Sequence, residues 1–387
     1  MKKYLLTIII LLIYFGSIYA DTIIVDCNGG GHYLTIQEGI DASQDNDIVL
    51  VYQGIYHETI VIDGKDIVVG SLYYTTQDPS YISQTVIKGD GSSPYSIIEL
   101  QNTMSTIIGF TILGPEPQTG ILSWVSIPSI EHNIIQNTEI GIRVQFKCPY
   151  IYKNSIYNND LGIQISSVSD PKAPGVFNNI IHDNVKGIEC SSESSPLIMN
   201  NIIYNNLQYG ISCNWFDTPE IFNNVIYGNN VGIQIIFHSE PNICNNTISV
   251  NHTGILAYSN TYAHISNSII YGNDFNLSEY EPGILTEIYI AYSCIGDGVP
   301  NWCIDEGGNI SEDPYFVDPN NDNYSLTWNS NYFSPCIDTG DPNTTWDPDN
   351  TPPDMGAIPA VAHDYFYNQY DGGIIDRVEW ISFPALN

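Results

Sequence analysis

The stretch NNIIYNN at residues 200–206 decides the fold, because near-copies of it recur on both sides. NNIIHDN begins at residue 178, NNVIYGN at residue 223 and NNTISVN at residue 245. The asparagine before each branched pair marks a repeat of 21–25 residues, with members Asn133, Asn154, Asn179, Asn201, Asn224, Asn246 and Asn267. An isoleucine stands two places after each of them, at Ile135, Ile156, Ile181, Ile203, Ile226, Ile248 and Ile269. A period of this length indicates a solenoid.

Each repeat has the pattern of short strands joined by turns. Apolar residues alternate with polar ones, which indicates half-buried strands, and Asn or Gly stands where a turn needs a left-handed backbone. A Gly-Ile pair follows most anchors, with its glycine at Gly141, Gly162, Gly187, Gly210, Gly232 and Gly254. One repeat cannot bury its own apolar face, so successive repeats must stack. Leucine-rich repeats have a similar period, but their Leu-x-x-Leu-x-Leu frame is missing, so the pattern favours a parallel β-helix.

A second set of asparagines lies five places past the anchors. Its members are Asn159, Asn184, Asn206, Asn229 and Asn251. When the repeats stack, these side-chain amides would form a ladder at one turn and would satisfy polar groups that a sharp inward turn strands. The repeated motif is therefore interpreted as one corner of a coil.

The start of the chain and its charge restrict where the protein works. Residues 1–20, MKKYLLTIIILLIYFGSIYA, have two lysines, an apolar run and a small residue at the end. They predict a signal peptide cleaved after Ala20, with a membrane anchor as the alternative. The formal net charge of −33 argues against nucleic acid and anionic lipid as partners. Half of the 10 basic residues fall in one window, at Arg143, Lys147, Lys153, Lys172 and Lys186.

Several segments resemble the secreted right-handed parallel β-helix proteins of the pectin-lyase-like superfamily. TIQEGIDASQDNDIVLVYQGIYHETIVIDGKDIVVGS, from residue 35, is similar to the opening cap of that group. There Thr35 and Glu38 form a capping box, and Ile36 and Ile40 form one apolar stripe. TVIKGDGSSPYSIIEL and TIIGFTIL are similar to early rungs, and GGNISEDPYFVDPNNDNYSL, SPCIDTGDP and DMGAI to the closing segment.

The resemblance implies an all-β fold, a right-handed parallel β-helix with a short N-terminal capping helix and a loop-rich C-terminal closing segment. The expected division is residues 1–20 as signal peptide, 21–62 as cap and first strands, 63–293 as rungs, 294–359 as closing segment and 360–387 as a tail that could begin a further domain. The superfamily includes lyases, hydrolases, epimerases and proteins without a known reaction, so the fold does not give the function. The WIDH stretch of pectate lyases and the NTD and GHG motifs of polygalacturonases are missing, so no catalytic residue is carried over.

Alternation along the strand that opens with Gly-Ile sends every second residue outward. Stacking then predicts two outward columns. The first is Leu122, Arg143, Gln164, Glu189, Ser212, Gln234 and Leu256, and the second is Trp124, Gln145, Ser166, Ser191, Asn214, Ile236 and Tyr258. Arg143 and Glu189 are two rungs apart, roughly 9.6 Å, which admits a sugar ring.

Charged and aromatic residues are expected to gather beside Glu189. The long connection SSVSDPKAP, residues 166–174, would place Asp170 and Lys172 there, and NWFD, residues 214–217, would add aromatic rings that stack on pyranoses. The candidate substrate-binding residues are Trp215, Phe216, Asn214, Gln164 and Trp124, and the candidate catalytic residues are Glu189, Asp217, Lys172 and Arg143.

We call the outward face around Arg143 and Glu189, with the loops beside it, the candidate groove. Two reactions and one noncatalytic role stay open for it. In a lyase, calcium held by Asp170, Glu189 or Asp217 would bridge to a uronate, and Lys172 or Arg143 would remove a proton. In a hydrolase, Glu189 and Asp217 would act as acid and as nucleophile or base. In a binding protein, these side chains would belong to a solvated polar strand face.

Other clusters carry weaker expectations. Asp338, Asp341, Asp347 and Asp349 lie in one loop whose oxygens could hold calcium, although the loop lacks an EF-hand frame. Cys190 and Cys213 share an inward position on successive rungs, which fits a thiol stack or a disulfide, and Cys294 and Cys303 are predicted to form a loop-closing disulfide.

Together these patterns predict a secreted or cell-surface protein, monomeric and free of the membrane after signal cleavage. Its expected partner is an extracellular polysaccharide or cell-surface glycan. Noncatalytic glycan binding is the first interpretation, because the known catalytic motifs are missing. A polysaccharide lyase or glycoside hydrolase is the alternative, and the sequence leaves open whether the protein is an enzyme.

Overall fold

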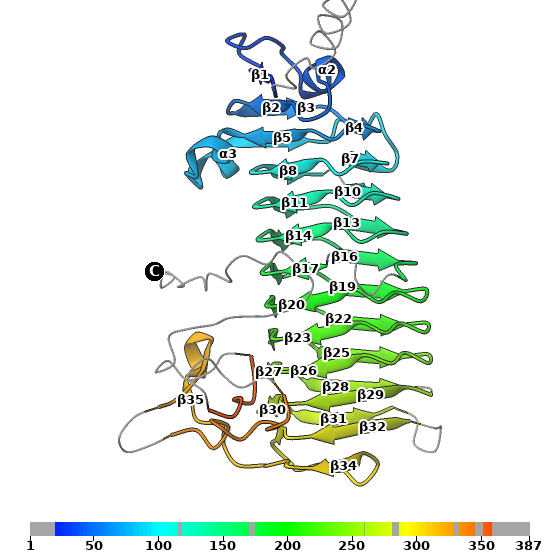
Figure 1. Ribbon diagram of the computed structural model, residues 1–387, viewed down its shortest axis with the longest axis vertical. Helices are drawn as coiled ribbons and strands as arrows, with labels where there is room; N and C mark the ends of the chain where they lie inside the picture. The colour runs from blue at the N-terminus through cyan, green and yellow to red at the C-terminus, as the bar shows by residue number, and fades with distance from the viewer. Residues whose placement is uncertain are drawn as a thin grey trace, which may run out of the picture.

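The computed structural model describes residues 20–114, 118–169, 175–258, 260–280, 286–328, 333–344 and 351–357. Within these residues the chain winds into a parallel β-helix, in which successive rungs add strands to sheets A, B and C in turn (Figure 1). No helix in the described ranges is long and apolar enough to cross a membrane. The expected signal peptide, apart from Ala20, and the expected tail lie outside the described residues.

The strands of each sheet pair in parallel along the axis of the coil. Sheet A contains β1 (Thr22–Val25), β2 (Ile48–Val51), β5 (Val68–Ser71), β8 (Thr106–Ile108), β11 (Ser129–Glu131), β14 (Tyr150–Tyr152), β17 (Val176–Phe177), β20 (Leu197–Met199), β23 (Glu220–Phe222), β26 (Asn242–Cys244), β29 (Tyr262–Ser266), β32 (Glu287–Ala291) and β34 (Ile304–Gly307). Sheet B contains β3 (Gly54–His57), β6 (Thr85–Lys88), β9 (Thr111–Leu113), β12 (Ile134–Gln136), β15 (Ser155–Tyr157), β18 (Ile180–His182), β21 (Ile202–Tyr204), β24 (Val225–Tyr227), β27 (Thr247–Ser249), β30 (Ile269–Tyr271) and β33 (Cys294–Ile295). Sheet C contains β4 (Ile60–Asp63), β7 (Ser96–Gln101), β10 (Thr119–Trp124), β13 (Ile140–Gln145), β16 (Leu161–Ser166), β19 (Lys186–Ser191), β22 (Tyr209–Asn214), β25 (Val231–Ile236), β28 (Thr253–Tyr258) and β31 (Phe275–Glu279).

The anchor isoleucines fill the interior of the coil. They pair in register as Ile135, Ile156, Ile181, Ile203, Ile226 and Ile248, and each is fully buried. The last expected member, Ile269, is wrong by one residue, because Ile248 pairs with Ile270. The predicted buried column is otherwise confirmed, and it supplies the hydrophobic stabilisation that a single rung lacks.

Two asparagine ladders line the turns on either side of sheet B. In the predicted ladder, the Asn184 amide donates to Asn206 at 3.1 Å and the Asn206 amide donates to Asn229 at 2.9 Å. The anchors form the other ladder, in which Asn201 donates to Asn224 at 3.0 Å. The first asparagine of each NN pair has a different role, because Asn200 adopts the left-handed backbone at φ 58°.

The Gly-Ile glycines serve close packing rather than the left-handed turns expected from the sequence. They are absent from the described residues with positive φ. A Cβ atom at Gly187 would lie 2.2 Å from the carbonyl oxygen of Gly210 on the next rung. Only glycine permits this approach between successive backbones.

Helices close the N-terminal end of the coil and flank the second rung. In α2 (Ile36–Ala42), the Thr35 hydroxyl accepts from the Glu38 N–H at 3.3 Å, and Ile36 and Ile40 are buried as predicted. The Glu58 carboxylate also accepts from the first helical N–H groups, at 2.9 Å from Ile36. The remaining α-helices in the described ranges are α3 (Leu72–Thr76) and α4 (Ser80–Gln84).

The closing segment packs against the last rungs of sheet B (Figure 1). It contains the antiparallel pair β35 (Phe316–Asp318) and β36 (Asn323–Leu326), joined by the 3-10 turn η1 (Pro319–Asn321). Hydrogen bonds hold it there, such as the one from the Ala357 backbone N–H to the Thr247 side-chain hydroxyl at 3.0 Å.

All eight cysteines are free, so the predicted disulfide between Cys294 and Cys303 is wrong. Cys294 is instead buried in a cluster with Leu326, Cys336 and Met355, and its thiol donates to the carbonyl of Glu312 at 3.2 Å. Cys190 and Cys213 pair in register as buried free thiols, so of the two alternatives the structure has the thiol stack.

Candidate functional site

The predicted outward columns of sheet C are confirmed. Arg143 pairs with Gln164 and Gln164 with Glu189, so these polar side chains occupy successive rungs of one strand face. The second column places Ser191, Asn214, Ile236 and Tyr258 side by side. Strand alternation, which the sequence shows directly, therefore positions these candidate residues.

Glu189 lies at the centre of a hydrogen-bonded cluster. One carboxylate oxygen accepts from the Gln164 amide at 3.3 Å, and the other accepts from the Tyr209 hydroxyl at 2.5 Å. The Lys186 ammonium lies 3.8 Å from the same carboxylate. Burial and the bond to Glu189 raise the pKa of Tyr209 far above its usual range, so this phenol stays a hydrogen-bond donor.

Arg143 lies on the same face. Its side chain is half-buried on β13, and its Nε is buried from solvent without a hydrogen-bond partner within the described residues. Asp170 and Lys172, which were expected to join Arg143 and Glu189, lie outside the described residues. Possible calcium binding by Asp170 and Glu189 therefore stays a prediction.

Asp217 lies inside the turn rather than on the groove surface. Its side chain is fully buried, and its two oxygens accept from the N–H groups of Ser194 at 2.8 Å and Asn214 at 2.7 Å. Burial raises the pKa of this carboxyl to about 7, although the two backbone bonds act in the opposite direction. In this position Asp217 holds the turn between rungs.

This buried carboxyl predicts a dependence of stability on pH. A carboxyl with a higher pKa in the folded chain binds its proton more tightly there, so its stabilising effect is full below about pH 4. That effect is lost as the pH rises towards the folded pKa of about 7. We expect Asp217→Asn to flatten this fall by up to about 1.4 kcal/mol per pH unit.

Urea unfolding of both proteins across the pH window measures the difference. Asp63→Asn removes an exposed carboxylate at the end of β4 and is the matched control. Parallel pH profiles of the parent and Asp217→Asn would show that this carboxyl is ionised normally in the fold.

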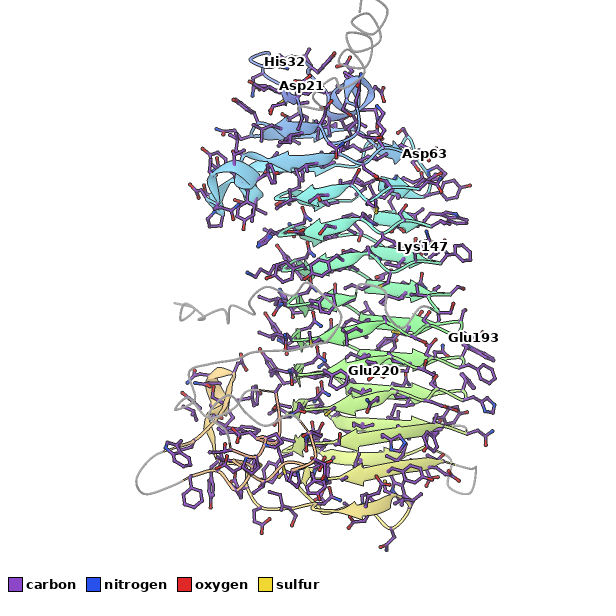
Figure 2. The ribbon with its side chains drawn as sticks, viewed as in Figure 1. Asp21, His32, Asp63, Lys147, Glu193 and Glu220 are labelled. Carbon is purple, nitrogen blue, oxygen red and sulfur yellow. The ribbon has the colours of Figure 1, made fainter. Side chains whose placement is uncertain are left out.

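Aromatic rings line the edge where the strands of sheet C end. Trp215 and Phe216 follow β22 with left-handed backbones, and each is 52% exposed. The aromatic edge, defined as Trp215, Phe237, Tyr258 and Tyr280, has ring centroids 4.7, 5.8 and 5.0 Å apart along the coil. Trp124 lies farther along the same sheet, 5.4 Å from Phe146. Lys147 and Glu193 mark this side of the molecule in Figure 2.

The structure describes only part of the loop around Asp338 and Asp341, in which calcium binding was expected. Asp347 and Asp349 lie outside the described residues. Asp341 accepts from the Asn343 N–H at 2.9 Å, while the Asp338 N–H donates to the Asp354 carboxylate at 2.9 Å. The described ranges contain no cluster of three or more His, Cys, Asp or Glu side chains suited to a metal. Calcium binding by this loop stays a prediction.

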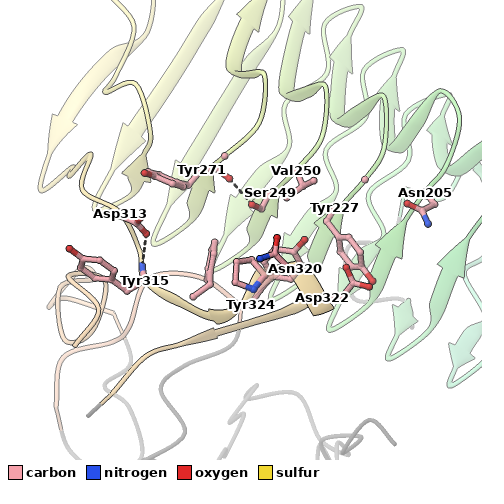
Figure 3. Close-up of a pocket in the computed structure, with 14 residues that line it drawn as sticks. Asn205, Tyr227, Ser249, Val250, Tyr271, Asp313, Tyr315, Asn320, Asp322 and Tyr324 are labelled. Atoms are coloured by element: carbon pink, nitrogen blue, oxygen red, sulfur yellow. Dashed lines mark hydrogen bonds between the residues drawn. The ribbon is translucent and has the colours of Figure 1, made fainter. Parts of the chain in front are cut away.

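A cavity of about 620 Å³ lies between sheet B and the closing segment, and the sequence reasoning missed it (Figure 3). Its walls include Tyr227 and Tyr271 from the rungs and Asp313, Asp322 and Tyr324 from the closing segment. The signal in the sequence was the tyrosine that follows the buried isoleucine in several repeats, as in Ile-Ile-Tyr at residues 202–204 and 269–271.

Comparisons with known proteins give one family match, to the central rungs, and several distant solved structures. No curated protein matches the sequence. A family model described as a right-handed beta helix region matches residues 96–248. The Azotobacter vinelandii mannuronan C-5 epimerase AlgE4 A-module is 16% identical, with a TM-score of 0.47 over 66% of this chain and 88% of that one. Pectate lyase Pel9A is 13% identical, with a TM-score of 0.47 over 89% and 98% of the two chains. An alginate lyase from Paenibacillus sp. str. FPU-7 is 10% identical, with a TM-score of 0.32 over 70% and 94%.

At these identities and TM-scores the likeness to the solved structures gives neither the fold nor the function of this chain. The repeats, the three parallel sheets and the family match over the central rungs lead to one assignment. The chain folds as a parallel β-helix, and its central rungs match the right-handed beta helix region.

Proposed function

We propose that the protein binds an extracellular polysaccharide, without cleaving it, along the outer face of sheet C. The observation that supports this most is the aromatic edge on the rungs of β22, β25, β28 and β31, which continues along the coil from the rungs of β13, β16 and β19 that carry Arg143, Gln164 and Glu189. Aromatic rings next to hydrogen-bonding side chains suit the two faces of a pyranose ring. Because a ring recurs on each of several rungs, the surface suits a polymer better than a single sugar.

The local charge makes this face accessible to an acidic or a neutral glycan. The protein as a whole carries a formal charge of −33, which repels anions. Arg143 and Lys186 lie on this face, however, and Lys147 follows the end of β13. These cations lower the local repulsion of an acidic glycan.

The carboxylates support binding rather than hydrolysis. Asp217, the second member of the expected acid pair, has both oxygens engaged by backbone N–H groups. Glu189 is fixed by Gln164 and Tyr209. A lyase or hydrolase is the alternative function. The proposal also includes a location outside the cell or on its surface, because residues 1–20 resemble a signal peptide.

Trp215→Ala tests the aromatic edge. We expect binding of the recognised polysaccharide to weaken by about 1 kcal/mol or more, roughly five-fold in the dissociation constant, because the substitution removes a stacking platform. Affinity electrophoresis against a polysaccharide panel, followed by calorimetry, measures the change. Trp328→Ala, which removes a tryptophan of similar exposure from the closing segment, is the matched control.

Glu189→Gln separates binding from turnover. It keeps the size and hydrogen bonding of the side chain and removes its charge, so affinity should stay nearly unchanged. Release of unsaturated products or reducing ends by the parent, lost in Glu189→Gln, would establish an enzyme instead. Binding by Trp215→Ala equal to that of the parent would move the site away from this face.

A further inference from the structure

The cavity beside sheet B differs in chemistry from the face of sheet C. Its floor is formed by turn residues that follow the strands of sheet B, with left-handed backbones at Asn205, Gly228, Val250 and Gly272. The closing segment forms the opposite wall (Figure 3). Its volume of about 620 Å³ falls within the usual range of ligand sites, so it holds one or two sugar residues rather than a long polymer segment.

The aromatic wall of the cavity is rigidly supported. Tyr227 ends a column of stacked rings, with Tyr204 at 5.0 Å and His182 a further 4.8 Å away. Tyr324 packs on the other side of Tyr227, 5.1 Å away, and is itself buried. Tyr271 and Tyr315 line the cavity beside these rings. Tyr227 and Tyr324 are almost fully buried, so they support the wall, and the rings that a sugar can reach are Tyr271 and Tyr315.

The polar groups of the cavity are carboxylates, amides and phenols. Asp313 and Asp322 both line it, and no lysine, arginine or histidine does so among the described residues. The charge of Asp322 helps burial to raise the pKa of Tyr227 above its usual range, so that phenol remains a neutral donor. These groups match hydroxyl groups, whereas a ligand carboxylate would meet two negative charges without a counterion.

We propose that this cavity binds an uncharged pyranose residue of a glycan, with its apolar face against the rings of Tyr271 and Tyr315 and its hydroxyls donating to Asp313 and Asp322. The site is separate from the aromatic edge, since it is built from sheet B and the closing segment. It excludes uronates, for which the basic residues on sheet C are better suited. The proposal stands independently of the function assigned to sheet C.

Matched oligosaccharides test the choice of ligand. The probes are 1,4-linked hexamers of mannose and galactose, each compared with the corresponding uronate hexamer, and a glucose hexamer. In calorimetry and saturation-transfer NMR with the full chain, we expect at least one neutral hexamer to bind more tightly than its uronate counterpart. No binding of any neutral hexamer, or tighter binding of the uronates, would overturn the proposal.

Two variants locate that binding. Tyr315→Ala removes a half-exposed ring from the cavity and should weaken the neutral hexamer about five-fold, while Tyr95→Ala, an exposed tyrosine near the start of β7, should not. Asp322→Asn should narrow the preference over uronate, whereas Glu306→Gln, an exposed charge on β34, should leave it unchanged. Loss of hexamer binding in Trp215→Ala but not in Tyr315→Ala would place the sugar on sheet C and overturn the cavity site alone.

Discussion

Ile203→Asp is expected to unfold the coil under conditions in which the parent is stable. Ile203 is fully buried between Ile181 and Ile226 in the central column. A carboxylate there meets only apolar neighbours, so the variant must bury an unpaired charge or protonate. The expected loss is about 3–5 kcal/mol in the free energy of unfolding, the usual effect of an uncompensated buried charge. Urea denaturation followed by far-ultraviolet circular dichroism measures it.

Ile55→Asp is the matched control for this experiment. Ile55 lies on β3 of the same sheet, but its side chain points outward and is 59% exposed. The change there should stay within about 0.5 kcal/mol of the parent. If Ile203→Asp unfolds at the same urea concentration as Ile55→Asp, the isoleucine column is not the interior of the coil.

The sequence predicts the register of the coil because burial and alternation repeat with it. Each rung needs an inward isoleucine, and the residues on either side must then face outward. This logic placed Arg143, Gln164 and Glu189 on successive strands, as the structure does. A solenoid makes such inference possible because each rung contacts only its neighbours, so a long-range contact reduces to a fixed step along the chain.

The predicted register was wrong at the last anchor, because a serine rather than an asparagine occupies the ladder position there. After Asn246 the ladder continues through Ser268, whose hydroxyl accepts from the Asn246 N–H at 3.2 Å. Asn267 takes the left-handed turn position at φ 47°, and its side chain accepts from the Asp341 N–H at 2.7 Å. Aligning on the letter Asn therefore slipped by one residue where the closing segment meets the rungs.

The placement of Asp217 depends on a turn that the repeat does not reveal. Trp215 and Phe216 both adopt left-handed backbones, which turn the chain so that the next side chain points inward. Asp217 thus joins a buried polar column with Ser194 and Ser239.

The cavity beside sheet B could not be predicted for a different reason. The closing segment is not a repeat, so the repeat period does not indicate which rungs this segment covers.

Asn201→Ala is expected to destabilise the fold by at least about 3 kcal/mol, since each buried polar group left without a partner costs about 1–3 kcal/mol. The Asn201 amide donates to the carbonyls of Val176 at 2.9 Å and Met199 at 3.1 Å. Its oxygen accepts from the Asn179 N–H at 2.9 Å. Alanine removes all of these bonds inside a fully buried turn, where water cannot replace them. Urea denaturation measures the loss.

Two further variants show whether the ladder bonds cause the effect. Asn230→Ala truncates an exposed asparagine and should change stability little. Asn201→Ser should fall between Asn201→Ala and the parent. Ser268 occupies a position of this ladder in the natural protein. Its hydroxyl accepts from the Asn246 N–H at 3.2 Å and donates to the carbonyl of Ser266 at 2.9 Å, so a serine at position 201 should restore part of the hydrogen-bond network. If Asn201→Ala is no less stable than Asn230→Ala, the ladder is only a sequence pattern, and the apolar column alone holds the rungs together.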